Sequence, residues 1–483
     1  MAIKVLMLGW EYPPHIAGGL GIACHGLSES LKDEGVHITF VVPHLNGDED
    51  GSRINLVSAS SIKVNVASVR NTTVITAHQG AGNELLSKTI FVDSTLSSYN
   101  LAHITEPVSS IQHWNNEILT SVNDVNHQIG KQTTSATLKL KGGYGKDLIQ
   151  EVGRYALVVE EISRNTEFDI IHAHDWMTYP AGIAAKRATG KPLVIHVHAT
   201  EFDRAGDGGS RAVYDIERTA MEESDSIVAV SKWTSDVLVT KYGTQRSKIH
   251  VVHNGVFQTR EVKSRTLSPV GDKFVTFLGR ITFQKGPEYF VEAAKKVLKQ
   301  FPDCHFIMAG SGDSLPQMIH RVASAGMSSR FHFTGFLNKK DIDRLLSFTN
   351  VYVMPSVSEP FGITPLEAIQ ANVPVIISKQ SGVSEVIANA LKVDFWDTDA
   401  LAQAICGILR HEGLAEMLRR NAMKDLSAIT WNSAAKKIKR IYYETIDAGL
   451  SADWAGSKRE ARDPLLPGSP AETFEEVGLS GHR

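Results

Sequence analysis

Continuous apolar runs that alternate with helical patterns constrain the fold of this chain more than any other feature. Such runs occupy residues 3–8, 38–42 and 226–230, and helix-like spacing of apolar residues fills 22–34 and 211–223. Strands that are buried on both faces lack polar alternation, and they occur in parallel sheets whose strands are joined through helices. The sequence therefore predicts an α/β protein in which helices cover both faces of a parallel sheet.

A second unit of the same kind follows a polar linker at residues 257–272. Its expected strands are 274–278, 305–309, 331–333, 351–354 and 374–377. We therefore predict two doubly wound, Rossmann-like domains, at residues 1–257 and 258–430, that face each other across a cleft. In such sheets ligands bind beyond the carboxyl ends of the strands, so polar residues that directly follow strands are the candidates for a site.

Three segments fall outside this regular pattern. Residues 45–150 are polar and rich in Ser, Asn and Thr, and we expect them to form an irregular insert in the first domain. An amphipathic terminal helix with a solvated basic face is expected at 431–447. Residues 448–483 are rich in Pro, Gly, Ser and charge, a composition that favours a flexible tail.

Composition narrows the class of protein. The net charge is −3 over 483 residues, and no basic stripe points to a nucleic-acid partner. Only three cysteines occur, far apart, which suits a reducing compartment, and we expect a cytoplasmic protein. The first residues do not resemble a signal peptide, and no apolar run is long enough to span a membrane. Peripheral membrane contact and oligomeric state are left open.

Residues 358–368 follow a strand-like run and join two carboxylates, Glu359 and Glu367, through a turn that contains glycine. We expect Thr364 at the N-cap of a helix and Pro365 at its first position. The backbone N–H groups of the turn would bind a phosphate, at Phe361, Gly362 and Ile363. Carboxylates that flank a phosphate-binding turn suit a nucleotide sugar. The alternative is structural: Glu367 completes a capping box, and Glu359 is a solvated loop residue.

Two further glycine-containing loops follow strands. The first loop contains Gly18-Gly19-Leu20-Gly21, but Cys24 stands where a dinucleotide fingerprint requires a third Gly or Ala, which disfavours a nicotinamide enzyme. The second loop runs from Gly279 to Gly286 and contains Arg280 and Lys285. A planar guanidinium and an ammonium group at the end of a parallel strand suit a diphosphate.

Histidines end two neighbouring strands of the first domain. His174-Asp175-Trp176 closes one strand and His198 the other, and these side chains suit contacts with sugar hydroxyls. His172, His196 and His253 are interpreted as structural. We find no complete metal-ligand set with matching spacing, and therefore predict no metal site. Ser231 and Lys232, after another strand, are weak candidates.

These pieces resemble those of retaining glycosyltransferases of the GT-B fold, specifically family 4, to which glycogen and starch synthases are closely related. The resemblance covers residues 1–447, is weakest in 45–150 and is absent from the tail. The matching pieces occur in the family's order: Gly18-Gly19-Leu20-Gly21, His174-Asp175-Trp176, His198, Arg280 with Lys285, and Glu359 through Glu367.

The resemblance implies a role for each residue. It places Arg280 and Lys285 on the departing diphosphate, Glu359 on the donor sugar, Glu367 on the ribose, and His198 near the reacting centre. It also implies phosphate contacts at Gly18 and Gly19 and around residues 361–364, and an acceptor side at His174 and Asp175.

The resemblance further implies transfer of a hexose, with glucose favoured, from UDP- or ADP-glucose to a glycan with retention of configuration, without a metal or another cofactor. Two departures leave α-glucan synthesis open. Ala17 stands before Gly18-Gly19 where bacterial glycogen synthases usually carry Lys, and Phe361 replaces a frequent Cys. The alternatives are a lipid or small-molecule acceptor, a nucleotide-sugar epimerase, a phosphorylase, and a non-catalytic glycan-binding protein.

Overall fold

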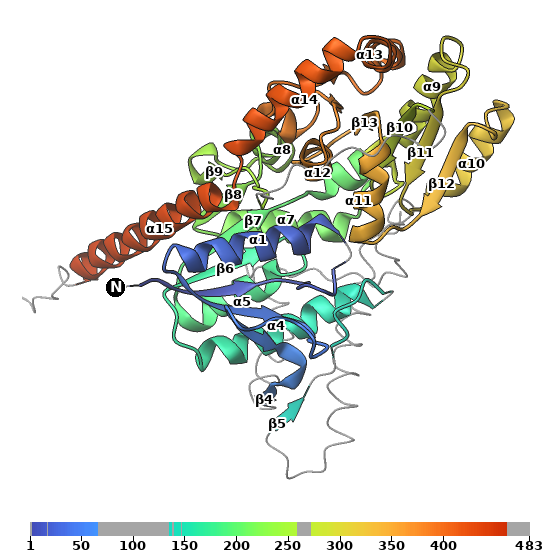
Figure 1. Cartoon of the computed structure of the whole chain (residues 1–483). Helices are drawn as coiled ribbons and strands as arrows, with labels where there is room; N and C mark the ends of the chain where they lie inside the picture. Colours follow the sequence, from blue (N-terminus) through green and yellow to red (C-terminus); the bar gives the residue numbers. More distant parts are fainter. Residues whose placement is uncertain are drawn as a thin grey trace, which may run out of the picture.

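The fold comes from a computed structural model that describes residues 2–16, 18–65, 135–137, 140–145, 147–257 and 272–460. Ala17, most of the predicted insert and linker, and residues 461–483 lie outside the described residues. Two α/β units follow one another along the chain, and a long C-terminal helix returns to the first of them (Figure 1). The predicted two-domain, Rossmann-like architecture is confirmed.

The first domain is built on a parallel sheet of seven strands among the described residues, in the order β3-β2-β1-β6-β7-β8-β9. The strands are β1 Lys4–Leu8, β2 His37–Val42, β3 Asn55–Ser58, β6 Ile170–His174, β7 Leu193–Val197, β8 Ser226–Ala229 and β9 Ile249–Val251. The helices are α1 Gly19–Asp33, α4 Leu148–Arg164, α5 Tyr179–Thr189, α6 Glu201–Ala205, α7 Arg211–Glu223 and α8 Lys232–Tyr242. Within the expected insert, β3 joins this sheet, and β4 (Lys63–Asn65) pairs antiparallel with β5 (Ser135–Thr137). The described part of the insert therefore contains regular strands, which we did not expect.

The second domain repeats this topology with a six-stranded parallel sheet, in the order β12-β11-β10-β13-β14-β15. Its strands are β10 Phe274–Leu278, β11 His305–Ala309, β12 Phe331–Gly335, β13 Val351–Met354, β14 Val375–Ser378 and β15 Leu391–Val393. Its helices are α9 Pro287–Val297, α10 Leu315–Ser324, α11 Lys339–Phe348, α12 Thr364–Gln370, α13 Thr398–Arg410 and α14 Glu412–Ser427.

Both sheets reverse their strand order at one point, between β1 and β6 in the first and between β10 and β13 in the second. At such a point the helices leave the sheet on opposite faces, which opens a crevice at the carboxyl ends of the two strands. The loops after these four strands contain most of the predicted site residues. The topology therefore places those residues at the two edges where ligands bind in this class of sheet.

The terminal helix α15 spans Trp431–Glu460, and its first part packs against the first domain. Trp431, Ala435 and Ile438 share an apolar core with Leu27 of α1 and Met7 of β1. The predicted crossing helix is therefore present, but it continues to Glu460 instead of ending near residue 447. Residues 448–460, which we expected to belong to the tail, are therefore helical, and the flexibility of the tail stays a prediction.

Candidate active site

The loop between β10 and α9 carries the two predicted phosphate-binding cations. Gly286 ends this loop with a left-handed backbone (φ 63°), and a Cβ there would lie 2.2 Å from the carbonyl oxygen of Pro355. Only glycine fits such a position, so the loop is pressed against the segment that follows β13. Arg280 bonds the side-chain oxygen of Gln284 at 3.5 Å within the same loop.

Lys285 and Glu359 form an ion pair between the ends of β10 and β13. Their side chains are 19% and 7% exposed, so the pair is largely withdrawn from solvent. Ser356 also donates to Glu359 Oε2, at 3.2 Å. Since Lys285 and Ser356 both bind Oε2, Glu359 Oε1 is the oxygen that remains to accept from a ligand hydroxyl. Glu359 is therefore a buried, oriented carboxylate and not a solvated loop residue.

The turn after Glu359 brings the two domains together. Gly362 has a φ of 99°, a conformation that favours glycine, and the following Ile363 reaches toward α1. A Cβ built on Gly19, at the start of α1, would lie 3.9 Å from the Cδ1 atom of Ile363. Gly19 and residues 361–363, which the sequence predicts on one ligand, therefore lie opposite each other across the domain boundary.

The start of α12 differs from the prediction. Thr364 is the first residue of the helix and Pro365 the second, and the cap position belongs to Ile363, which already has a helical backbone (φ −78°, ψ −36°). The Thr364 hydroxyl accepts from Tyr352 at 2.7 Å. Glu367 pairs with Lys339 of α11 at 2.9 Å. The capping-box interpretation of Glu367 is therefore wrong, and its carboxylate faces a neighbouring helix.

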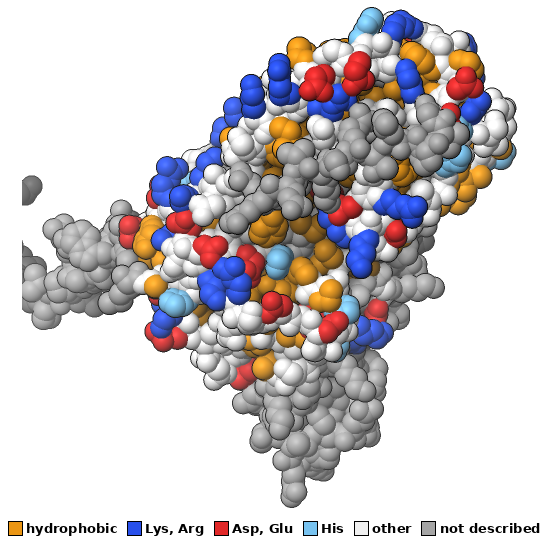
Figure 2. Space-filling view, in the orientation of Figure 1, with side chains coloured by type: hydrophobic (Ala, Val, Ile, Leu, Met, Phe, Trp, Pro, Cys, Tyr) orange, Lys and Arg blue, Asp and Glu red, His pale blue; other side chains and the backbone are white. Residues whose placement is uncertain are grey.

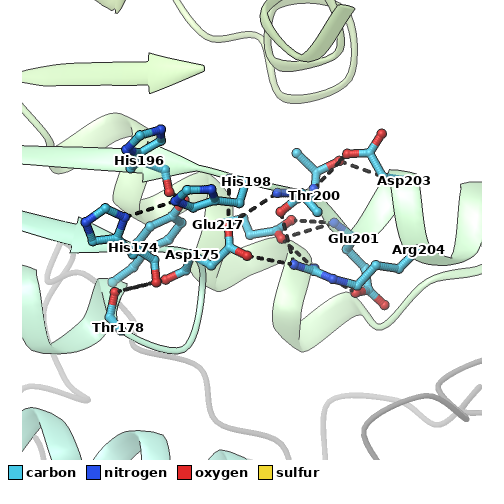
Figure 3. Close-up of polar contacts among 12 residues, drawn as sticks. His174, Asp175, Thr178, His196, His198, Thr200, Glu201, Asp203, Arg204 and Glu217 are labelled. Carbon is cyan, nitrogen blue, oxygen red and sulfur yellow. Dashed lines mark hydrogen bonds and ion pairs between the residues drawn. The ribbon is translucent and has the colours of Figure 1, made fainter. Parts of the chain in front are cut away.

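In the first domain, Asp175 organises the ends of β6 and β7 (Figure 3). It has a left-handed backbone (φ 60°), which is rare for a residue other than glycine and marks a constrained position. Its Oδ1 atom accepts from the backbone N–H of His198 at 2.7 Å and of Ala199 at 3.3 Å. His174 Nδ1 lies 3.0 Å from His198 Nε2. Asp175 and His174 thus position His198, and their role on the acceptor side stays a prediction.

The His198 imidazole is held neutral. Burial lowers the pKa of His198 below its usual value, although the nearby Asp175 carboxylate acts in the opposite direction. A neutral imidazole that bonds His174 through Nε2 keeps Nδ1 for other partners. This arrangement suits a hydrogen bond to a sugar hydroxyl better than an ion pair with a phosphate.

A buried charge network beside Asp175 escaped the sequence analysis. Arg204 of α6 lies 3.1 Å from Glu217, 3.5 Å from Glu201 and 3.7 Å from Asp175 (Figure 3). Burial raises the pKa of Glu217 to about 8, against the attraction of Arg204. The sequence Thr200-Glu201-Phe202-Asp203-Arg204 could have indicated this network, because it places three charged residues shortly after β7.

Hydrogen bonds from Ser358 and Glu385 connect the second domain to the first. Ser358, which precedes Glu359, donates to Asp203 of α6 and accepts from the Trp233 indole at 3.2 Å. Lys232 and Trp233 are the first two residues of α8. Glu385 accepts from their backbone N–H groups at 2.9 and 2.8 Å. These contacts hold the loop of Glu359 against the first domain.

The Glu385 carboxylate also lies 2.8 Å from His253 Nε2. Burial by itself raises the pKa of Glu385, but the hydrogen bonds from His253 and the two backbone N–H groups leave it below its usual value. The weak candidate Lys232 therefore serves the domain contact through its backbone. Ser231 caps α8 by accepting from the backbone of Thr234 at 2.9 Å.

The prediction of no metal site rests on spacing along the chain and stays a prediction, although the tertiary structure groups possible ligands. Among the described residues, His172, His174 and His196 each offer a ligand atom within 4.8 Å of the others, and Cys24 forms a second such group with His174 and His198. Spacing along the chain did not show these groups because their members come from different elements of the first domain. The consequence of the first group is developed below.

The distribution of side chains on the surface indicates a ligand site less clearly than these loops do. Charges of both signs are interspersed on the face in Figure 2, with hydrophobic side chains in the middle of the view. A cavity of about 460 Å³ lies at the amino ends of β1 and β2, where Lys4, His37 and Arg53 line it. This cavity lies at the amino ends of the strands, whereas the candidate site residues lie at their carboxyl ends.

None of the described helices has the length and apolar character needed to cross a membrane.

Comparison with known proteins shows which family this chain resembles. Family models match three successive parts of the chain: "Starch synthase catalytic domain" at residues 4–97, "Glycosyltransferase Family 4" at 139–260 and "Glycosyl transferases group 1" at 258–425. A glycogen synthase of Mycobacterium tuberculosis is 25% identical over 453 residues, which cover 91% of this chain and 94% of that protein.

An α-maltose-1-phosphate synthase of Mycolicibacterium smegmatis is 30% identical over 311 residues, which cover 56% of this chain and 78% of that protein. The solved structure of sucrose-phosphate synthase from Thermosynechococcus elongatus shares the fold, with a TM-score of 0.64 at 16% identity over 92% of this chain and all of that one. The chain therefore belongs to the glycosyltransferases of the glycogen and starch synthase type, with the two-domain GT-B fold.

Proposed function

We propose that this glycosyltransferase moves glucose from UDP- or ADP-glucose to a growing α-1,4-glucan, with retention of configuration at the anomeric carbon. The observation that carries the proposal is the buried Lys285–Glu359 pair at the switch point of the second sheet. The pair adjoins the turn at residues 361–363, which faces Gly19 of the other domain. The likeness to a glycogen synthase along 91% of the chain supports the glucan acceptor.

Each residue at the switch point has a task in the proposed donor complex. Arg280 and Lys285 neutralise the diphosphate, since both lie on the loop that follows β10. Glu359 accepts hydroxyl groups of the sugar through Oε1, while Lys285 and Ser356 hold Oε2. Glu367 accepts from the ribose hydroxyls with the oxygen that Lys339 leaves available.

The proposed reaction breaks the bond between the anomeric carbon and the β-phosphate oxygen. The acceptor hydroxyl forms the new bond on the same face of the sugar, and its proton passes to the departing phosphate oxygen. Lys285 and Arg280 stabilise the negative charge that develops on the nucleoside diphosphate. Glu359 acts as a binding group, because a carboxylate already engaged by an ammonium and a hydroxyl is a poor nucleophile. The proposed transfer uses no cofactor and no metal on the phosphates.

A second candidate acceptor is a phosphorylated sugar. The relative of 30% identity is named for α-maltose 1-phosphate, a product in which glucose is joined to a hexose 1-phosphate. The family assignment disfavours the epimerase, phosphorylase and glycan-binding alternatives. A lipid acceptor has no described feature in its favour.

The test is a donor and acceptor screen. The purified chain is incubated with UDP-, ADP- and GDP-glucose, each with glycogen, with glucose 1-phosphate or with no acceptor, and the products are measured by mass spectrometry. We expect nucleoside diphosphate release that depends on glycogen, and an α-linked product. Transfer only to glucose 1-phosphate would replace the glucan proposal by the second candidate. Failure of every nucleoside diphosphate to raise the melting temperature would refute the donor site.

A further inference from the structure

Four histidines form a patch on one face of the first sheet. His172 and His174 alternate along β6, His196 lies on β7, and His198 directly follows β7. Side chains two residues apart point to the same face of a strand, and His174 is the register partner of His196. The four imidazoles therefore lie close together on one face of the sheet.

Three of these imidazoles are buried with nitrogens that have no partner. His172 and His174 are 0% exposed, and His196 is 2% exposed. His172 Nε2, His174 Nε2 and both ring nitrogens of His196 make no hydrogen bond. A buried polar group without a hydrogen-bond partner lowers the free energy of unfolding by about 1–3 kcal/mol. The cluster is therefore destabilising unless a ligand binds the nitrogens.

The opposite nitrogens of two rings are held in place. His172 Nδ1 lies 2.6 Å from the hydroxyl of Tyr442, which comes from α15. His174 Nδ1 lies 3.0 Å from His198 Nε2. Histidine ligands of metals usually have one nitrogen on the metal and the other on an orienting hydrogen-bond partner. His172 and His174 show this division, with Nε2 as the available nitrogen in both.

We propose that His172, His174 and His196 bind a divalent transition metal of the zinc class. Imidazole nitrogens are preferred ligands of such ions, and two histidines on one strand plus one on its neighbour supply three of the four positions of a tetrahedral site. One ring nitrogen of each residue lies within 4.8 Å of the other two. Zinc–nitrogen bonds of about 2.0–2.1 Å would draw these nitrogens closer by up to about 1.5 Å.

This approach requires mainly the ring of His196, whose two nitrogens make no hydrogen bond, to turn about its Cβ–Cγ bond. The rings of His172 and His196 are now stacked, with 3° between their planes. Such a rotation moves no backbone atoms. It points the ring nitrogens, which now have no partner, toward one common position. Burial lowers the pKa of His172 to about 3 and that of His174 and His196 well below the usual value, so the rings are in the neutral form that a metal needs.

The bound ion would have a structural role next to the candidate active site. It would join β6 to β7 and, through Tyr442, fix α15 on the first domain. A metal on His174 Nε2 leaves the proton on Nδ1, which then donates to His198 Nε2. The metal would thereby set the tautomer of the histidine that we place near the donor sugar, without touching the sugar or the phosphates.

The test measures metal retention by the full chain, produced without a histidine tag. The protein is stripped with a chelator, incubated with Zn²⁺, desalted and analysed by mass spectrometry for zinc. His196→Gln removes one proposed ligand. His332→Gln is the matched control, because His332 also contacts a histidine on a neighbouring strand, His305, at 2.8 Å, but belongs to no such group among the described residues.

We expect about one zinc per chain in the wild type and in His332→Gln, and at least about fivefold less in His196→Gln. No retained zinc in the wild type, or equal zinc in both variants, would overturn the proposal. Cobalt gives a measurement on the wild type alone, in case His196→Gln does not fold. An intense tetrahedral absorption spectrum supports the site, and the weak spectrum of hydrated Co²⁺ refutes it.

Discussion

Glu359→Gln is the change that tests the candidate active site most directly. The substitution keeps the size of the side chain and an acceptor for Ser356, and it removes only the negative charge. A hydrogen bond from a sugar hydroxyl to a carboxylate contributes about 1.5–3 kcal/mol, so its loss in the transition state lowers kcat/KM by about 10- to 150-fold. The fall should appear mainly in kcat, since we place Glu359 on the sugar that is being transferred.

The same substitution has a predictable effect on stability. Removing one partner of a buried ion pair costs about 3–5 kcal/mol, and the 19% exposure of Lys285 reduces this through solvent screening to about 2 kcal/mol. For a domain of this size that loss corresponds to a melting temperature roughly 5 °C lower. The variant therefore stays folded at 25 °C, and a loss of activity there reports on the site.

The assay follows nucleoside diphosphate release from the donor identified by the screen, together with thermal denaturation of each variant. Glu222→Gln is the matched control, because it makes the same chemical change in an exposed pair with Arg218 on α7, at 2.9 Å. Exposed pairs contribute little, so this variant should behave as the wild type does. Activity of Glu359→Gln within about threefold of the wild type would refute the sugar contact.

Three further predictions concern the phosphates, the domain contact and the terminal helix. Lys285→Ala should lower kcat about 100-fold or more and abolish thermal stabilisation by nucleoside diphosphates; retained stabilisation would contradict a phosphate contact. The pKa of Glu385 lies below its unfolded value, so its contribution to stability is complete above about pH 4.5 and is lost as the pH falls below this. Melting curves between pH 3 and 6 should therefore fall less steeply in Glu385→Gln, and an unchanged acid limb would contradict this linkage. Trp431→Ala should cost about 3–5 kcal/mol in urea unfolding, because Trp431 is 3% exposed against α1, whereas Trp396→Ala, at a side chain 57% exposed, should change little.

Hydrogen bonds between the domains hold the loop of Glu359 against the first domain. Ser358 bonds Asp203 and Trp233 on one side of Glu359, and Glu385 binds the start of α8 on the other. These bonds join residues that are more than 120 positions apart in the sequence. Hinge opening between the domains must break them, so they contribute to the balance between open and closed forms.

Residue spacing along the chain was sufficient to place the predicted residues of the second domain. Apolar runs located the strands, and polar residues directly after β10 and β13 had to lie at one edge, because parallel strands share their carboxyl ends. Lys285 and Glu359 therefore meet as expected. The helix at 431–447 was also recognisable, although its continuation to Glu460 was obscured by a composition typical of tails.

Local patterns determined the strands, the helices, the two doubly wound domains and the edge at which ligands bind, because burial and backbone hydrogen bonding act over a few residues at a time. Only the tertiary structure decided which side chains became partners. It paired Glu367 with Lys339 instead of its own helix end, and assembled His172, His174 and His196 into a cluster. These contacts depend on strand order, register and helix packing, none of which the spacing within a single segment specifies.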